Sequence, residues 1–301
     1  MQFIQQMING LTIGAFYSLV ALGYTMVYGV LKLINFAHGD LFMWGAYLGL
    51  TGLNVLLALL AQTSAWAILP VVIIVMTTVA LAGVLVERVA YRPLRTAGRL
   101  APVISALGVA FILESLARNV YGASWKTYPA GITPTGRIAL GGNVRVSVMQ
   151  IVVLVASFLI MGALYLFIQR TRTGTAMRAV SLDHDISRLM GIDVDRIISI
   201  VFIIGPGLGG VAGLIVALYY GSFDFTLGWV FGLKAFIAAI LGGIGNIPGA
   251  MLGGMLLGII ETLGSGYISP QWKDVIAYVI LIVILIFRPT GLLGERMAQK
   301  L

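Results

Sequence analysis

Long apolar stretches separated by short charged segments dominate the sequence. The uncharged stretches are residues 11–31, 41–86, 146–169, 197–223 and 235–260. A helix needs about 20 mostly apolar residues to cross the hydrocarbon core of a membrane, and these stretches reach or exceed that length. The strands of a membrane barrel alternate polar and apolar residues, whereas these stretches do not. The pattern therefore predicts an all-α, polytopic membrane helix bundle.

About nine spanning segments fit this pattern. The seventh and eighth are short, and only the glycine-rich run 242–249 separates them. They could instead form one long broken helix, which would leave eight spans, or a re-entrant pair, which would also change the count. The predicted spans are 7–30, 36–60, 66–87, 101–121, 147–168, 197–219, 229–241, 248–263 and 274–287.

The basic residues of the loops predict the orientation of the bundle. With these spans, thirteen Lys and Arg residues lie on the side of the loops 87–101 and 170–196 and of the C-terminus, and six lie on the opposite side. Lys and Arg gather in cytoplasmic loops of membrane proteins. We therefore expect the N-terminus outside and the C-terminus in the cytoplasm, which requires an odd number of spans.

Composition excludes several classes of protein. Only 10% of the residues are charged, against about 25% in a soluble domain. The net charge of +8 does not indicate a nucleic-acid partner, because the topological rule already explains the basic loops. The sequence contains no Cys, which excludes disulfide bonds and thiolate metal sites.

We expect one transmembrane domain over residues 1–301, with two longer loops. The outer, periplasmic loop 122–146 is polar and rich in Gly and Pro, so we expect irregular structure there. The inner loop 170–196 has apolar residues at helical intervals and Gly191 in a position typical of a helix C′ residue. It predicts a short amphipathic helix or helix pair that docks into a groove of another protein. A solvated helix without a partner is the alternative.

Two segments interrupt the apolar pattern. Residues 34–40 contain Asn35 and His38, and residues 242–249 contain Asn246 and Pro248. Interrupted membrane helices leave backbone groups that must be buried in protein or line a cavity, as they do in transporters. The sequence leaves open whether these segments are plain turns or parts of a translocation pathway.

Two acidic residues fall within predicted spans. Glu114 could pair with Arg118 one helical turn later, and Glu261 lies near an outer helix end where it could reach water. A pathway would include Asn35, His38, Glu114, Asn246 and Pro248.

Glycines recur at intervals of four residues. The pairs include Gly10 and Gly14, and Gly254 and Gly258. Small residues at this spacing let membrane helices approach closely, so we expect tight packing within the bundle.

The chain shows no sign of chemistry of its own. No phosphate-binding G-x-x-x-x-G-K-[ST] motif occurs, and no Ser/His/Asp grouping, zinc motif or pair of carboxylates indicates an enzyme. Protonatable residues within the spans are sparse, although a carrier driven by an ion gradient usually needs them. We therefore expect a transport protein that is driven by a separate ATPase and binds no cofactor itself.

Four segments resemble the permease subunits of bacterial high-affinity branched-chain amino acid ABC importers. The resemblance covers essentially the whole chain and favours the H-type permease over its longer M-type partner. The segments are GLTIGAFYSLVALGYTMVYGVLKLINFAHGDLFMWGAYLG, ERVAYRPLR, KAFIAAILGGIGNIPGAMLGG and FRPTGLLG.

This resemblance implies a set of partners in the bacterial inner membrane and on either side of it. They are a second homologous permease, two cytoplasmic ATPase subunits that use ATP and Mg²⁺, and a periplasmic substrate-binding protein. The inner loop 170–196 would then fit a groove on the ATPase. We expect Arg178, Asp183, Asp185, Arg188, Gly191 and Ile192 to transmit nucleotide-driven closure to the membrane helices.

The resemblance leaves the substrate open. It implies import of leucine, isoleucine and valine, but similar permeases carry urea, amides or other small polar solutes. A carrier driven by an ion gradient, a passive channel and a subunit without its own pathway are the rival classes.

Overall fold

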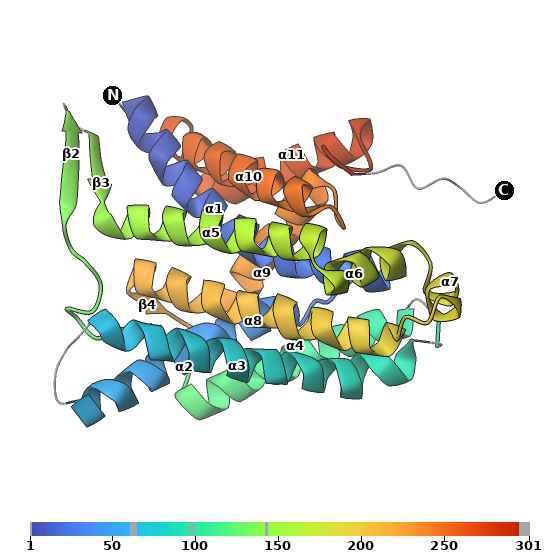
Figure 1. Ribbon diagram of the computed structural model, residues 1–301. Coiled ribbons are helices and arrows are strands. Elements are labelled where there is room, and N and C mark those ends of the chain that lie inside the picture. The colour runs from blue at the N-terminus through green and yellow to red at the C-terminus, as the bar shows by residue number, and fades with distance from the viewer. Residues whose placement is uncertain (1, 61–64, 96, 99, 142–143, 295–301) are drawn as a thin grey trace.

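The computed structural model is a bundle of long α-helices (Figure 1). It describes residues 2–60, 65–95, 97–98, 100–141 and 144–294. The helices in these residues are α1 (Gln2–Leu31), α2 (His38–Leu60), α3 (Ile68–Val86), α4 (Leu100–Tyr121), α5 (Val148–Arg170), α6 (Arg172–Leu182), α7 (His184–Leu189), α8 (Val194–Tyr220), α9 (Leu227–Gly242), α10 (Ile247–Tyr267) and α11 (Lys273–Phe287). Short 3-10 turns occur at Ala65–Ala67, Arg92–Leu94 and Pro270–Trp272, and a π-helical turn occurs at Glu87–Tyr91. The predicted all-α class is confirmed.

Eight of the described helices are long and apolar enough to cross a membrane, and α9 is a shorter apolar helix. The predicted segments 229–241 and 248–263 correspond to α9 and α10, which are separate helices joined by a turn. The alternative of one long broken helix is therefore wrong. Physically, Gly243 and Gly245 both take positive φ values, which end α9 and reverse the chain.

The helices α1 and α8 form the centre of the bundle. Most residues of both helices are buried, and α1 packs along α10 while α8 packs against α2 and α3. A Cβ added to Gly10 would lie 2.7 Å from Cα of Ile259, and one added to Gly14 would lie 2.7 Å from Cα of Met255. The four-residue glycine spacing thus lets α1 and α10 approach closely, which confirms the predicted packing role.

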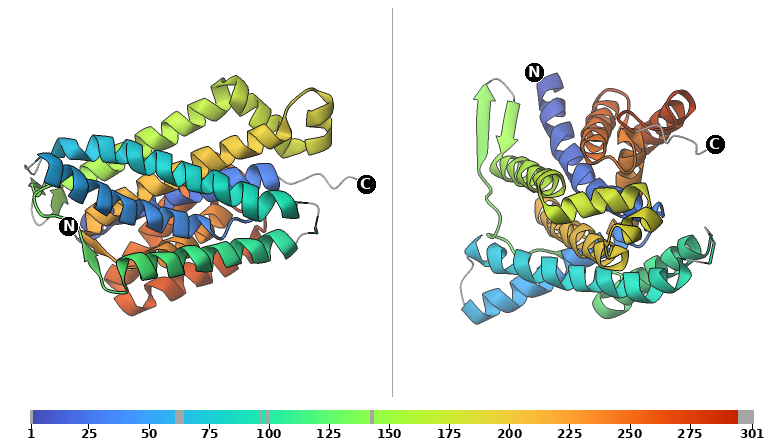
Figure 2. Two further views of the ribbon diagram at one scale, coloured as in Figure 1. Left: turned by 90° about the horizontal axis from the view of Figure 1, so that it is seen from below. Right: turned by 45° about the vertical axis from the view of Figure 1, so that its right-hand side comes forward.

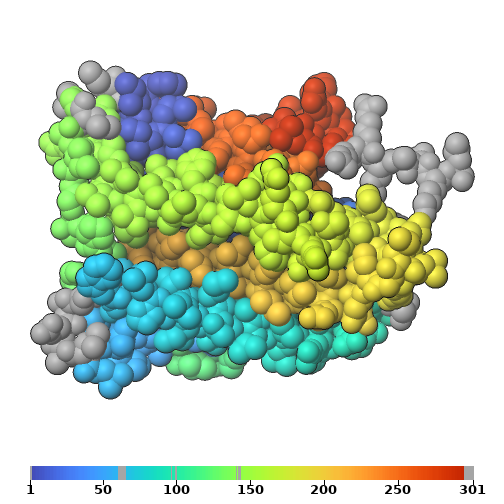
Figure 3. Space-filling model, in the orientation of Figure 1, coloured from blue at the N-terminus to red at the C-terminus, as the bar shows by residue number. Residues whose placement is uncertain are grey.

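The peripheral helices expose large apolar side chains. Examples are Ile73 of α3, Ile112 of α4, Leu159 of α5 and Ile282 of α11. In Figure 3, α5 runs along the face toward the viewer between α3 and α10. Such a surface is stable when lipid or another membrane helix covers it.

The bundle has two distinct ends. Gln6 of α1 lies beside Gly266 of α10 at the end that holds the strands, which we call the outer end. At the opposite, inner end, His184, the first residue of α7, contacts the carbonyl oxygen of Val30 near the end of α1. These names follow the charge-based orientation, which remains a prediction.

The outer loop is more regular than the sequence indicated. Strand β1 (Lys126–Thr127) pairs with β4 (Ser222–Phe223), and β2 (Arg137–Gly141) pairs with β3 (Val144–Ser147). Figures 1 and 2 show the β2–β3 hairpin beside the start of α1. The expectation of irregular structure is wrong here, because alternate residues of β3 are buried and stabilise an extended conformation.

Tyr128 fixes the rest of the outer loop to the bundle. Its hydroxyl group donates a hydrogen bond to the carbonyl oxygen of Ala46, with an O···O distance of 2.7 Å. Burial raises the pKa of the Tyr128 phenol. The phenol therefore stays neutral and remains a donor at physiological pH.

The inner loop forms two helices, α6 and α7, as the sequence predicted. Gly191 has φ +82° and follows α7 at the C′ position. The N–H groups of Gly191 and Ile192 donate to the carbonyl oxygens of Arg188 and Ser187, each at 3.0 Å. This Schellman motif confirms the predicted role of Gly191 in ending the helix.

Candidate functional site

Helix α2 begins inside the bundle. His38 is its first residue, and Nε2 of His38 lies 3.2 Å from the carbonyl oxygen of Val20, near the middle of α1. Since α1 ends only at Leu31, the six residues between the two helices return into the bundle alongside α1. The interruption at 34–40 is therefore a buried break and not a turn at the surface.

A second break precedes α9, at residues 221–226. A Cβ added to Gly228 would lie 2.8 Å from the carbonyl oxygen of Gly39 and from Oδ1 of Asp40. The first turns of α2 and α9 are therefore side by side, with the positive ends of the two helix dipoles close together. The buried side chain of Asp40 lies at this junction.

The other interruption predicted from the sequence, residues 242–249, has a different role. It is the turn between α9 and α10, where Oδ1 of Asn246 accepts from the N–H of Gly249 at 2.9 Å and caps α10. Nδ2 of Asn246 donates to the carbonyl oxygen of Leu293 at 2.9 Å, and Pro248 lies in the first turn. The structure does not bring Asn246 and Pro248 to the junction of α2 and α9.

The side chains of the first break are buried and only partly hydrogen-bonded. Oδ1 of Asn35 accepts from the hydroxyl group of Tyr91 at 3.0 Å, but its Nδ2 has no partner. His38 is fully buried against Tyr24, with ring centroids 4.9 Å apart, and its Nδ1 also has no partner. Buried polar groups are normally satisfied, so both side chains keep unused hydrogen-bonding capacity.

Glu114 is half-buried on α4 and acts electrostatically on Asp40 of α2. The ion pairs found among the described residues do not include one between Glu114 and Arg118. The guanidinium group of Arg118 instead lies over the ring of Phe225, with Cζ 5.7 Å from the ring centroid. Glu114 therefore belongs to the surroundings of Asp40 at the start of α2.

A charged network connects the inner loop to the first break. Asp195, in the first turn of α8, accepts from Arg95 at 2.6 Å and from Arg92 at 3.1 Å. Arg95 also binds Glu87, and Glu87 accepts from the hydroxyl group of Ser199 at 3.2 Å. Glu87 begins the same π-helical turn that ends at Tyr91, the partner of Asn35.

The coupling residues predicted on the inner loop fall into two groups. Arg178 faces inward, where its Nη1 donates to the carbonyl oxygen of Ile168 at 2.9 Å, and Asp183 caps α7 through the N–H of Asp185 at 2.9 Å. Asp185 and Arg188 are exposed and lie 3.8 Å apart. Arg178 and Asp183 therefore shape the loop, whereas Asp185 and Arg188 lie on its surface.

The same loop carries an exposed apolar surface that we call the inner patch. It consists of Leu182, Ile186, Leu189 and Met190, with exposed fractions of 85%, 57%, 86% and 77%. Met177 and Val180, which continue the same apolar pattern in the sequence, are buried against the bundle. Figure 3 shows α6 and α7 forming the inner end of the molecule.

Sequence reasoning missed a buried charge cluster near the outer end. Nζ of Lys234 donates to Oε1 of Glu261 and to Oδ1 of Asp274, each at 2.7 Å. The hydroxyl group of Tyr17 donates to Oε2 of Glu261 at 2.7 Å. Glu261 is 5% exposed and is paired with Lys234 and Tyr17, so it is a partner within the bundle that borders the outer cavity rather than a freely solvated end residue. The signal in the sequence was a Lys and a Glu of opposite charge in two separate apolar segments.

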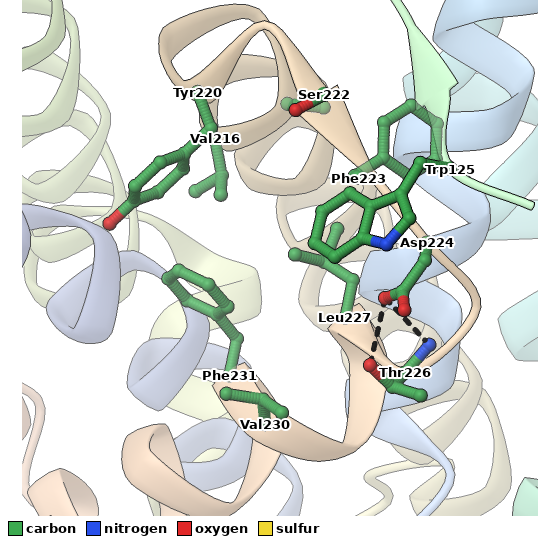
Figure 4. A pocket seen from close by; sticks show the side chains of 11 residues that line it. Trp125, Val216, Tyr220, Ser222, Phe223, Asp224, Thr226, Leu227, Val230 and Phe231 are labelled. Atoms are coloured by element: carbon green, nitrogen blue, oxygen red, sulfur yellow. Dashed lines mark hydrogen bonds between the residues drawn. The ribbon is translucent and has the colours of Figure 1, made fainter. Parts of the chain in front are cut away.

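Two adjoining cavities lie at this outer end. The outer polar cavity has a volume of about 420 Å³ and contains the side chains of Lys234, Glu261 and Thr262. The outer apolar cavity, of about 260 Å³, includes Leu227 and Asp224, and Figure 4 shows Tyr220 and Phe231 opposite Trp125. Tyr220, Val230 and Phe231 line both cavities. Volumes of this order suit a small ligand.

Within the described residues, no group of three or more His, Cys, Asp or Glu side chains could hold a metal ion. The polar groups of the site are instead amides, hydroxyls and ion pairs between apolar helices. Such groups bind and orient a small polar molecule.

These features define an integral membrane helix bundle in which two helices begin inside the bundle beside buried polar groups, an arrangement typical of transport proteins. Sequence comparison gives the particular family. The chain belongs to the family of the branched-chain amino acid transport system, permease component, whose pattern matches residues 6–285.

Individual relatives cover nearly the whole chain. It is 42% identical to the high-affinity branched-chain amino acid transport system permease protein BraD of Pseudomonas aeruginosa, over 99% of this chain and 98% of the relative. It is 40% identical to the corresponding protein LivH of Escherichia coli, over 99% and 97%. A more distant relative, 28% identical over 54% of this chain and 51% of its own length, is the probable branched-chain amino acid transport permease protein LivM of Methanocaldococcus jannaschii. No solved structure matches the chain.

Proposed function

We propose that this chain is the membrane-spanning permease subunit of an ATP-driven importer that moves leucine, isoleucine and valine into the bacterial cytoplasm. Family membership and the names of the full-length relatives support the substrate class. The chain would work in the inner membrane and would not itself be an enzyme. ATP and Mg²⁺ would be used by partner subunits.

The inner patch is the observation that most directly supports a separate ATPase subunit as the energy source. Four large apolar side chains on one short segment are costly to expose to water, and such patches mark sites of protein interaction. The exposed pair Asp185 and Arg188 adds charge beside them. A cytoplasmic ATPase subunit with a groove for α7 would cover this surface.

The attachment of the inner loop supports transmission of motion. Arg178 ties α6 to the end of α5, and His184 ties α7 to the end of α1 through Nε2, 2.7 Å from the carbonyl oxygen of Val30. Asp195, in the last residues of the loop, binds Arg95, which binds Glu87 at the start of the turn that contacts Asn35. A displacement of α7 would therefore act on α1, α5 and the first break together.

The proposed assembly contains a second homologous permease, two ATPase subunits and a periplasmic substrate-binding protein. The exposed apolar faces of the peripheral helices offer surface for a second permease as well as for lipid. A relative that is named LivM is a permease distinct from those named LivH, which supports pairing of two different permeases.

The test is the ATPase activity of the co-expressed complex in lipid, with and without its amino-acid-loaded binding protein. We expect stimulation by protein loaded with leucine, isoleucine or valine. If no ATPase subunit co-purifies, the proposal fails and a carrier driven by an ion gradient is the better explanation. Stimulation by urea- or amide-loaded protein alone would keep the mechanism and replace the substrate class.

Two glycine substitutions sharpen this test. Gly191→Arg forces a side chain into a left-handed conformation at the end of α7, at φ +82°. Gly122→Arg imposes the same strain at φ +83° in the outer loop, and a Cβ at either glycine meets nothing within 4 Å. We expect Gly191→Arg to abolish stimulation while the complex still assembles, and Gly122→Arg to retain it. Normal transport by Gly191→Arg would contradict the coupling role of the inner loop.

A further inference from the structure

The charge cluster in the outer polar cavity is unusual for a position inside a membrane bundle. Lys234 and Glu261 are 8% and 5% exposed, and each lies on a helix that has no other charged residue. A buried ion pair seldom adds net stability over apolar packing, because both charges lose their hydration. Ionisable side chains within membrane helices usually face a pathway or a ligand. The cluster also borders a cavity, so a ligand could reach it.

Thr262 gives a second, independent indication. It lines the same cavity and is 7% exposed, but its Oγ1 has no hydrogen-bond partner. A hydroxyl group in a membrane helix commonly bonds to the carbonyl oxygen four residues earlier, as Thr77 does to Ile73 at 2.8 Å. The hydroxyl group of Thr262 therefore keeps unused hydrogen-bonding capacity in the wall of the cavity.

This cavity is bordered by a positive group, the ammonium of Lys234, that lies beside negative carboxylate groups. Nζ of Lys234 is 2.7 Å from a carboxylate oxygen of Glu261 and 2.7 Å from one of Asp274. An α-amino acid carries its ammonium and carboxylate groups on one carbon atom, so it can pair with both signs at once. A ligand with a single charge would satisfy one partner and leave the other unpaired, which is costly when buried.

The adjoining cavity suits the rest of such a ligand. The outer apolar cavity presents Val216, Leu227, Val230 and Phe231, and it shares Val230 and Phe231 with the polar cavity (Figure 4). A short aliphatic chain attached to the charged carbon would lie against these side chains and be removed from water.

We infer that the two outer cavities form a binding site for a zwitterionic amino acid with an aliphatic side chain. Its carboxylate group lies at Lys234 and Thr262, its ammonium group lies at Glu261, and its side chain occupies the outer apolar cavity. This inference rests on the proposed function and adds to it the place where the permease itself recognises the substrate.

A single-cysteine protection experiment tests the site. The chain has no Cys, so Ser265→Cys, on the lining of the polar cavity, introduces a unique thiol. The labelling rate of this chain by a small maleimide is measured in the purified importer in lipid nanodiscs, without ATP. We expect millimolar leucine to slow labelling at least fivefold. Leucinamide and 4-methylpentanoate, which each lack one of the two charges, should slow it less than twofold.

A control thiol and three substitutions complete the design. Ala123→Cys, exposed in the outer loop, should label at the same rate with and without leucine. In the Ser265→Cys background, Thr262→Val keeps the shape of the side chain and should raise the leucine concentration for half-protection about tenfold, since it removes a hydrogen bond to a charged group. Ser157→Ala also removes a buried, unpartnered hydroxyl group, but from α5 and outside both cavities, and should leave that concentration unchanged. Glu261→Gln should abolish protection.

The outcomes separate the site from the proposed function. If loaded binding protein stimulates the ATPase but leucine does not slow labelling, the site is wrong and the proposed function stands. Equal protection by leucine and the single-charge analogues, or equal effects of Thr262→Val and Ser157→Ala, would also overturn the site. If neither stimulation nor protection occurs, both proposals fail.

Discussion

Arg92 and Arg95 both bind the carboxylate of Asp195, but they differ in burial. The Arg92 side chain is 51% exposed, whereas that of Arg95 is 16% exposed and also binds Glu87, which is almost fully buried. An exposed ion pair contributes little to stability, because water and salt screen it. A buried carboxylate that loses its partner is costly. At the residue scale, burial rather than the number of ion pairs therefore decides which arginine contributes more to the free energy of unfolding.

This difference gives a prediction. We expect Arg95→Met to lower the free energy of unfolding by about 3 kcal/mol, because Glu87 would keep only its hydrogen bond from Ser199. Arg92→Met should cost at most about 1 kcal/mol. The measurement is SDS-induced unfolding of the purified chain in detergent micelles, followed by far-UV circular dichroism. Equal losses for the two variants would show that Glu87 does not depend on Arg95.

At the scale of elements, the contact between α1 and α10 depends on glycine. A Cβ on Gly258 would lie 2.6 Å from the carbonyl oxygen of Gly10 and would also collide with the backbone of Gly14. Backbone atoms cannot move aside as a flexible side chain can, so a larger residue would separate the two helices. By contrast, a Cβ on Gly108 of α4 would meet nothing within 4 Å.

Gly258→Ala and Gly108→Ala should therefore have opposite effects. We expect Gly258→Ala to lower the free energy of unfolding by about 1–3 kcal/mol through overpacking. Gly108→Ala should raise it by about 0.5–1 kcal/mol, because alanine loses less backbone entropy in a helix. The same SDS titration measures both. A neutral Gly258→Ala would mean that α1 and α10 can shift apart without cost.

The glycine pattern illustrates what sequence can say about elements. Four-residue spacing predicted that Gly10, Gly14, Gly254 and Gly258 lie in helix contacts, and they do. It did not predict that α1 and α10 are the partners, because spacing within one helix carries no information about the other. The break at 221–226 was missed for a similar reason. The predicted spans 197–219 and 229–241 already placed these residues in a connection, and only the packing of α9 beside α2 shows that this connection returns into the bundle.

At the scale of the whole molecule, the two ends of the bundle differ in structure. Strands, the charge cluster and two cavities lie at the outer end, whereas α6, α7 and the inner patch lie at the other (Figure 1). An importer receives its substrate on one side of the membrane and is driven by the conformational change of ATPase subunits on the other. Its permease would need two different ends of this kind. The charge-based orientation assigns the strands to the periplasm.

Thiol labelling tests this orientation. Ala123→Cys in the outer loop should react with a membrane-impermeant maleimide in intact spheroplasts, because its residue is exposed at the outer end. Leu182→Cys, at a position that is 85% exposed on the inner end, should react only after lysis when the chain is expressed alone. The reverse result would invert the topology and place the inner patch where no cytoplasmic ATPase could reach it.

The sequence by itself determined the membrane class, the positions of most helices and the role of Gly191 in ending a helix. These features depend on local properties, namely the length of an apolar stretch and the conformation that one residue can adopt. It also placed Asn35 and His38 in a break, since a run of Asn, His, Gly and Asp is out of place among apolar residues.

Only the tertiary structure decided which side chains meet. Lys234 and Glu261 are 27 positions apart in sequence, and Tyr17 is 244 positions from Glu261, yet hydrogen bonds of 2.7 Å join all three. Only the tertiary structure likewise shows that Met177 is buried and Leu189 is exposed, although both follow the same apolar pattern. The physical reason is that a partner is chosen by the packing of helices distant in sequence, and periodicity within one helix does not encode that packing.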